Sequence, residues 1–192
     1  ETVAWMKTQL EEAKKQGVTV IPVSHHNLLD ESTLYPEECT IENTKEVTAL
    51  LEAYGVPVYL SGHLHLQRIK KHTSNLNTPG GYGIREIVTS PLPMAPCQYS
   101  ILNWQADGSL SYHTKKVDIA GWAQRYGEED ENLLNFDAYA DQFLVDVISE
   151  QTFKALQSAS KDIKEEMARL YADMNQGQKF SCKQACVELL TF

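Results

Sequence analysis

The sequence predicts an α/β fold followed by a helical region. Residues 1–61 read as helix, strand, helix, strand, the order typical of parallel strands joined by right-handed crossovers. Residues 64–118 then alternate apolar and polar positions between turn-forming clusters, as antiparallel strands do. Apolar residues recur at helical spacing in residues 120–192. We therefore expect a mixed sheet of parallel and then antiparallel strands over residues 1–118, and a helical C-terminal extension over residues 119–192.

The first four elements follow from apolar spacing and chain breakers. Residues 2–16 have apolar side chains at helical spacing, and Gly17 is a natural stop. Residues 18–24 (VTVIPVS) are β-branched and apolar on both faces, which predicts a buried strand, although proline cannot donate to a strand ladder. Residues 41–55 return to helical spacing, and residues 56–61 (VPVYLS) predict a second buried strand.

The later elements are four strands and three helical stripes. The expected strands are LHLQRIKKHT, YGIREIVTS, QYSILNW and SLSYHTKKV, an antiparallel continuation of the sheet. One apolar stripe lies within residues 133–148 and a second within residues 163–174. A third, short stripe is SCKQACVELL at the end of the chain.

Charge and hydropathy exclude two classes of partner. The net charge is −9, mostly from residues 118–192, and no basic stripe is present, so binding to a nucleic-acid backbone is not expected. No apolar run approaches the ~20 residues needed to cross a bilayer, and no signal peptide is visible. The first residue is Glu1 rather than Met, which is typical of a piece of a longer chain. We expect a soluble protein, and leave open whether it is cytoplasmic or exported.

The four cysteines form no CxxC pair. They are Cys39, Cys97, Cys182 and Cys186. We expect buried or free thiols, with a disulfide or a metal site as the alternatives.

Histidine pairs follow both predicted parallel strands. His25 and His26 come just after the first strand, and His63 and His65 just after the second. Because ligands bind beyond the carboxyl ends of parallel strands, the two pairs should converge. His63 and His65 are two positions apart and would project to one side of an extended chain, and Gly62 lets the backbone approach a ligand closely. Neutral imidazole is a common ligand of zinc and iron. The remaining two histidines, His72 and His113, read as ordinary polar residues.

These motifs resemble the C-terminal half of calcineurin-like metallophosphoesterases. That family carries five metal-binding blocks in order: Asp-x-His, Gly-Asp-x-x-Asp, Gly-Asn-His-(Asp/Glu), a single histidine, and Gly-His-x-His. Gly62-His63-Leu64-His65 matches the fifth block, and His25-His26 matches the fourth. The stretch REIVTSPLPMAPCQYSILNWQADGSLSYHT also resembles the strands that follow in bacterial members. The resemblance covers residues 1–118, and the helical region matches nothing that we can name.

The resemblance implies a binuclear metal centre in a metallophosphoesterase-type α/β sandwich. It implies that His25 and His63 bind one divalent metal ion (Mn, Fe or Zn) and His65 the other. His26 and Gly62 would be supporting or alternative ligands, and no catalytic residue is assigned.

The first three blocks are absent from the 192 residues. We therefore expect the intact parent protein to hydrolyse a phosphomonoester or phosphodiester, with a nucleotide or cyclic nucleotide among the candidate substrates. Residues 1–192 alone should bind metal weakly or not at all and show negligible activity.

Two other interpretations remain open. The chain could be a non-catalytic binding module with a degenerate metal site, whose acidic helical tail or exposed sheet edge contacts a partner or a second copy. Alternatively, His25, His63 and His65 could hold one structural zinc ion.

Overall fold

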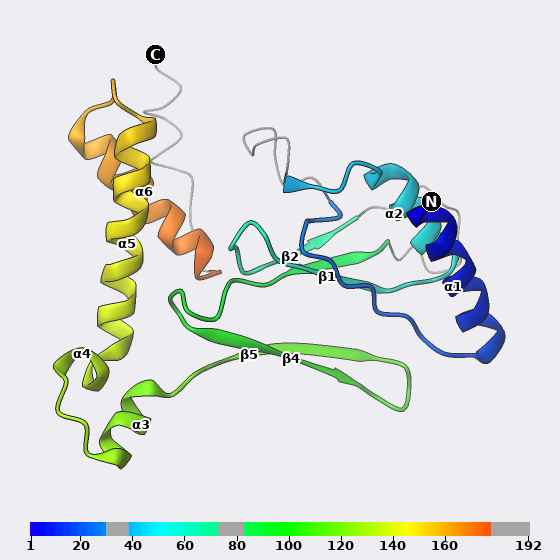
Figure 1. The fold of residues 1–192 in the computed structure, drawn as a ribbon, viewed down its shortest axis with the longest axis horizontal. Helices are drawn as coiled ribbons and strands as arrows, with labels where there is room; N and C mark the ends of the chain where they lie inside the picture. The colour runs from blue at the N-terminus through cyan, green and yellow to red at the C-terminus, as the bar shows by residue number, and fades with distance from the viewer. Residues whose placement is uncertain (30–38, 73–82, 178–192) are drawn as a thin grey trace. The chain divides into compact units, whose positions relative to one another are not determined.

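The computed structural model describes residues 1–29, 39–72 and 83–177 (Figure 1). The chain divides into two compact units, Glu1–Thr89 and Ser90–Phe192. The described residues form six helices and five strands, which confirms the predicted α/β class. Those strands make two separate small sheets, so the predicted metallophosphoesterase-type sandwich with a continuous mixed sheet is not confirmed.

The domain boundary after residue 118 stays a prediction, and the third helical stripe lies outside the described residues. Within the described segments, no helix combines the length and apolar character needed to cross a bilayer.

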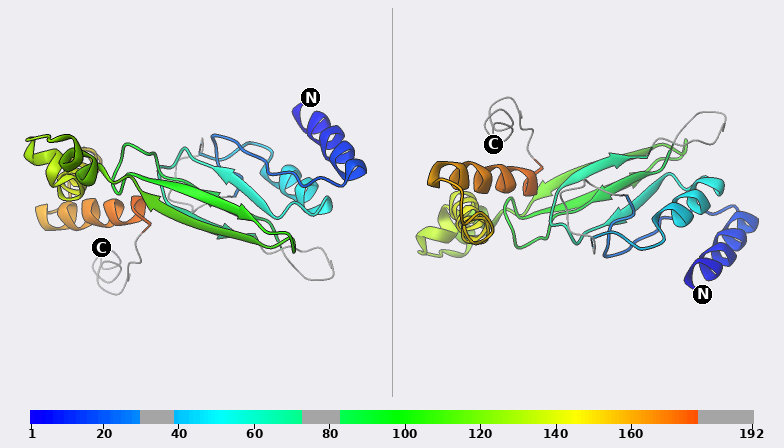
Figure 2. Two further views of the ribbon diagram at one scale, coloured as in Figure 1. Left: turned by 90° about the horizontal axis from the view of Figure 1, so that it is seen from below. Right: turned by 90° about the horizontal axis from the view of Figure 1, so that it is seen from above.

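Two helices of the first unit lie next to each other at one end of its sheet (Figures 1 and 2). The first, α1 (Thr2–Gln16), has the predicted bounds and ends at Gly17, whose φ of 65° turns the chain back onto the last helical turn. The second, α2 (Thr44–Ala53), begins three residues later than predicted. The reason is that the residues before α2 pair with another segment. The Ile41 N–H donates to the Asn27 carbonyl oxygen (3.0 Å), and Thr40 forms a parallel bridge with Asn27.

The first unit contains a three-stranded sheet in the order β1-β3-β2. Strand β1 (Val58–Ser61) pairs in parallel with β3 (Arg85–Val88), and β3 pairs antiparallel with β2 (Arg68–Lys71). All three strands were predicted, but the parallel β1–β3 pair was not, because a wholly antiparallel continuation was expected. As a result, the residues after β1 lie beside the segment that follows β3.

Residues 18–24 do not form the predicted regular strand. They make a single parallel bridge to β1, in which the Ser24 N–H donates to Leu60 O and the Leu60 N–H donates to Pro22 O, both at 3.0 Å. The next bond of a parallel ladder would run from the N–H of residue 22 to the carbonyl of Val58. Proline has no N–H, so the ladder stops there.

One hydrophobic core holds the first unit together. Its buried members come from both helices, the loop after residue 26 and the sheet: Leu10, Leu28, Leu29, Val47, Leu51, Val56, Tyr59 and Ile84. Because Leu28 and Leu29 directly follow the first histidine pair, core packing fixes the position of that loop.

A hairpin opens the second unit. Strands β4 (Gln98–Trp104) and β5 (Leu110–Lys116) pair antiparallel through seven residue pairs. Gly108 sits in the connecting turn with φ 81°, a conformation that glycine adopts without strain. Both strands were predicted, but they form a sheet of their own rather than a continuation of the first one.

Up to residue 177, the described chain after the hairpin forms four helices: α3 (Ile119–Tyr126), α4 (Glu131–Leu134), α5 (Phe136–Ala155) and α6 (Lys161–Asn175). The Asp118 side chain caps α3 by accepting from the Gly121 N–H (2.9 Å). The core of the second unit lies mainly between α5 and α6 and contains Ala95, Cys97, Ala140, Leu144, Ile148, Ala168 and Ala172.

The described cysteines are free, buried thiols. Cys39 and Cys97 both fit that expectation. Cys182 and Cys186 lie outside the described residues.

Candidate functional site

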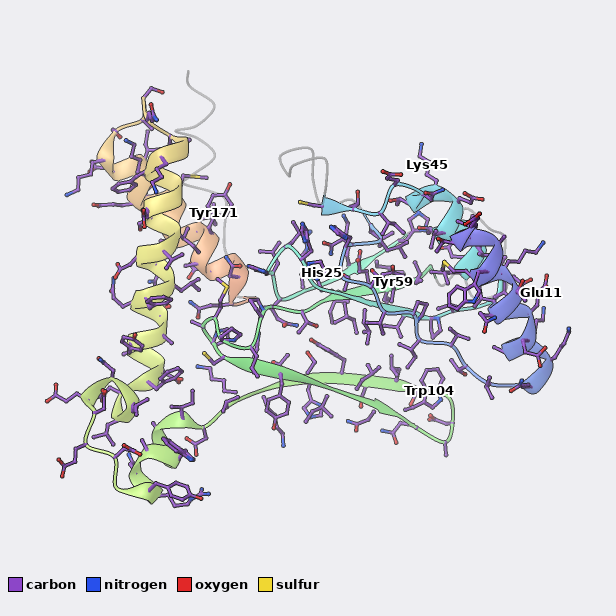
Figure 3. All side chains as sticks on the ribbon, viewed as in Figure 1. Glu11, His25, Lys45, Tyr59, Trp104 and Tyr171 are labelled. Atoms are coloured by element: carbon purple, nitrogen blue, oxygen red, sulfur yellow. The ribbon has the colours of Figure 1, made fainter. Side chains whose placement is uncertain are left out.

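Three of the four candidate histidines form a cluster beyond the end of β1. The ring centroids of His25 and His63 are 4.9 Å apart, those of His26 and His63 4.4 Å, and those of His25 and His26 5.3 Å. His25 Nε2 and His63 Nδ1 are 3.0 Å apart, so one ring donates a hydrogen bond to the other, in a direction set by the tautomers. Figure 3 labels His25 beside Tyr59 of β1. The convergence expected from the strand order is therefore present for His25, His26 and His63.

The backbone at the second histidine pair is not extended. His63 and His65 both have a φ of 56°, which is rare for residues other than glycine. The Leu64 N–H donates to the Gly62 carbonyl oxygen at 2.7 Å and closes a tight turn around His63. The expectation that His63 and His65 project to one side of a strand is therefore wrong, and His65 is exposed.

The environment of His63 favours the neutral imidazole. Burial lowers the pKa of His63 below its ordinary value, and the nearby His26, His25 and His65 rings lower it further. A histidine must be neutral to act as a metal ligand. At neutral pH, His63 is therefore in the form that binds metal.

A buried carboxylate lies beneath the histidine cluster. Glu86, in the middle of β3, is 0% exposed. Its Oε1 accepts from the Leu28 N–H (2.6 Å), the Ser61 hydroxyl (2.6 Å) and the Asn27 side-chain amide (3.3 Å). Its Oε2 accepts from the Leu29 N–H (2.7 Å). Glu86 therefore ties the loop after His26 to the residue that precedes Gly62.

A second set of hydrogen bonds fixes the start of the first histidine pair. The Tyr59 hydroxyl donates to Ser24 Oγ (2.7 Å), and the Ser24 hydroxyl donates to the carbonyl oxygen of His26. The Gly62 N–H donates to the carbonyl oxygen of His25 at 3.1 Å. These bonds hold His25 and His26 through their backbone carbonyls and use none of the imidazole nitrogens.

The spacing of two ring nitrogens is close to what a metal ion requires. Two imidazole nitrogens at ~2.05 Å from one tetrahedral ion lie about 3.4 Å apart. The 3.0 Å between His25 Nε2 and His63 Nδ1 is about 0.4 Å shorter. Over the described residues, however, no group of three or more His, Cys, Asp or Glu side chains is arranged to hold an ion. The cluster therefore fits part of a coordination sphere, namely two nitrogen ligands.

A groove of about 1470 Å³ opens next to the cluster within the first unit. Its walls are α1, residues 20–26 and the first turn of α2, and His26 lies among its lining residues. The α1 wall contributes Trp5 and Met6, while Lys45 lies on the α2 side. The groove therefore combines an apolar wall with polar and basic groups, and both lie in the unit that carries the histidines.

Exposed aromatic side chains mark the helices of the second unit. Trp122 and Tyr126 of α3 are 46% and 67% exposed, with ring centroids 5.5 Å apart. On α5, Tyr139 and Phe143 are 44% and 55% exposed. The apolar stripe predicted for α5 is therefore wider than the face that packs on α6.

Several supporting residues were missed from the sequence. Glu86, Tyr59 and Asn27 were not singled out, and near Ser24 and Ser61 only the backbone carbonyls were expected to orient the histidine rings. The one usable signal was an acidic residue directly before the apolar pair Ile87 and Val88, since a buried carboxylate needs partners. Its partners lie 25 to 59 positions away along the chain, so the sequence could not name them.

Comparison with known proteins places similarity in the helical region. Residues 118–186 match a family model described as the C-terminal domain of cyclic nucleotide phosphodiesterase. The matched segment is a little over a third of the chain and starts at the residue that caps α3. A search of curated proteins found no match.

This finding corrects the family suggested by the histidine motifs. The matching family is different from the calcineurin-like metallophosphoesterases, so that resemblance assigned the chain to the wrong family. The match also falls on the helical region, which the resemblance of the histidine motifs does not cover. It indicates a phosphodiesterase-related function.

Proposed function

We propose that this protein hydrolyses the phosphodiester bond of a cyclic nucleotide, with a divalent metal ion bound at the histidine cluster. The observation that carries the proposal is the match of residues 118–186 to a domain of cyclic nucleotide phosphodiesterase. The cluster of His25, His26 and His63 supports it, because the same chain gathers three imidazoles beside an open groove.

In this proposal, His25 Nε2 and His63 Nδ1 hold the metal ion. Their 3.0 Å separation opens to ligand spacing with a small shift. His26 and the exposed His65 are the further candidate ligands. A bound divalent ion would polarise a phosphoryl oxygen and lower the pKa of a coordinated water. A second ion would need carboxylate ligands, which the described residues do not bring to the cluster.

The groove supplies room for the nucleoside part of the substrate. Trp5 and Met6 offer an apolar wall for a base, and Lys45 offers a positive charge for a phosphate. Trp5 and Lys45 are exposed and can be substituted without opening the core, whereas Met6 is partly buried and packs against it.

The experiment measures hydrolysis of cyclic AMP and cyclic GMP by the full-length natural protein with Mn²⁺, Fe²⁺ or Zn²⁺. His63→Ala should lower kcat/KM by at least about 100-fold, because it removes one of two facing ligands. His113→Ala is the matched control, since His113 is an exposed histidine of β5 outside the cluster. No metal-dependent hydrolysis of either nucleotide, or an equal loss in both variants, would overturn the proposal.

A second candidate function is protein binding by the second unit. The exposed aromatic residues Trp122, Tyr126, Tyr139 and Phe143 favour it, because large exposed aromatic side chains are enriched at interfaces. Sedimentation of wild-type and Phe143→Ser protein tests self-association through the aromatic surface. A monomeric wild type at all concentrations would exclude it, and His63→Ala should leave it unchanged.

A further inference from the structure

Glu86 is a charged residue in a place that normally excludes charge. It is 0% exposed in the middle of β3, between Tyr59 of β1 and Lys70 of β2 in the strand register. Burying a carboxylate is strongly unfavourable unless hydrogen bonds replace the lost water. The four donors around Glu86 supply that replacement.

Those four donors come from the two segments that carry the clustered histidines. Three of them, on Asn27, Leu28 and Leu29, directly follow His26 in the chain. The fourth is the hydroxyl of Ser61, two residues before His63. The Ser61 oxygen also accepts from the Asn27 side-chain amide at 3.1 Å, which joins the two segments a second time.

Glu86 is not itself a candidate metal ligand. Both carboxylate oxygens already accept hydrogen bonds from the protein, Oε1 from three donors and Oε2 from one. The side chain also has no exposed surface. Any influence on the histidines must therefore pass through the segments that it binds.

We propose that Glu86 is a positioning residue that sets the His25–His63 separation by binding both histidine segments at once. The inference rests on the proposed metal site, because ligand spacing matters only if an ion binds there. A carboxylate is required because both of its oxygens accept hydrogen bonds. In a glutamine at this position, the side-chain N–H₂ group would replace one of the two oxygens. At least one protein donor would then face another donor and lose its hydrogen bond.

The experiment compares Glu86→Gln with Glu12→Gln in the full 192-residue chain. Glu12 is an exposed glutamate of α1 whose ion pair with Lys15 is at the surface, so its variant is the matched control. Ser61→Ala removes one donor and keeps the carboxylate, and it serves if Glu86→Gln fails to fold by circular dichroism. The first readout is the Kd for Co²⁺, and the second is the NOE between the ring protons of His25 and His63 without metal.

Removal of a group that orients ligands typically lowers metal affinity 10–100-fold. We expect a Kd increase of about that size for Glu86→Gln, a smaller increase for Ser61→Ala, and none for Glu12→Gln. The NOE should weaken in the same order.

The two readouts separate the possible failures. If the wild type binds Co²⁺ and a folded Glu86 or Ser61 variant matches the Glu12→Gln control in both readouts, Glu86 does not position the histidines. If the wild type binds no Co²⁺, the proposed metal site is wrong. In that case an unchanged NOE overturns the positioning role, and a weakened NOE supports it as a structural one.

Discussion

Titration of residues 1–192 with a divalent metal should load one ion per chain, at His25 and His63. Their facing nitrogens are 3.0 Å apart and must separate by about 0.4 Å to bind one tetrahedral ion. Neither ligand brings a negative charge, and among the described residues no carboxylate joins them in a group that could hold an ion. The lack of negative charge limits the number of bound ions, and the small number of ligands limits the affinity.

Electrostatic repulsion excludes a second ion beside the first. Two divalent cations ~4 Å apart repel by about 17 kcal/mol at an effective dielectric constant of ~20, and neutral imidazoles do not offset that energy. Affinity for one ion should also be modest. Four-ligand structural zinc sites bind with about 10–16 kcal/mol, so two nitrogen ligands should give roughly half, or a Kd between ~1 μM and a few hundred μM.

The assay is equilibrium dialysis against Co²⁺ at pH 7.5, with the visible spectrum recorded on the same samples. Nitrogen ligation gives d–d bands without the thiolate charge-transfer band that binding to cysteine would add. His25→Ala and His63→Ala should each weaken binding at least tenfold, while His113→Ala should not. Two ions per chain, a Kd below about 10 nM, or a thiolate band would refute the reasoning.

Three further predictions concern the scaffold. Leu28→Ala should lower the free energy of unfolding of the first unit by about 2–5 kcal/mol in urea titration, because the Leu28 side chain is 0% exposed. The hydrogen bond from the Leu28 N–H to Glu86 uses only the backbone, so the substitution keeps it. Pro22→Ala should restore a donor toward Val58, so the new amide should exchange slowly with solvent; fast exchange would mean that the ladder stops for another reason. Asp118→Ala should destabilise α3 by about 1 kcal/mol, measured as faster hydrogen exchange at the Gly121 amide, and unchanged exchange would show that the cap contributes little.

Local sequence signals predicted much of the fold. Helix α1 and its stop at Gly17 need only apolar spacing and a residue that tolerates positive φ, and both are readable from adjacent residues. The meeting of His25 with His63 was also predictable, because it needs only that two parallel strands end at the same edge. These features depend on chain order and not on side-chain detail.

Features set by distant residues could not be predicted. The partial pairing of residues 18–24 depends on which carbonyl faces Pro22, which is a matter of register between separate segments. The parallel β1–β3 pair joins residues 27 positions apart, and the Glu86 contacts span up to 59 positions. The family was misjudged for a related reason. A four-residue histidine motif is short, whereas the matching family model spans residues 118–186.

The conformation of the histidine turn is imposed by its surroundings. A left-handed backbone costs a non-glycine residue roughly 1–2 kcal/mol, and His63 and His65 both adopt it within three residues. Together that is about 2–4 kcal/mol, a sizeable part of the 5–15 kcal/mol that stabilises a typical domain. The turn begins directly after Gly62, which is hydrogen-bonded to the carbonyl of His25, and after Ser61, which is bonded to Glu86. A backbone conformation that is unfavourable for histidine is thus maintained by hydrogen bonds to a buried carboxylate and to a neighbouring segment. Strain maintained in this way is characteristic of sites selected for the direction in which a side chain points, and it supports a ligand-binding role for the imidazoles over a purely structural one.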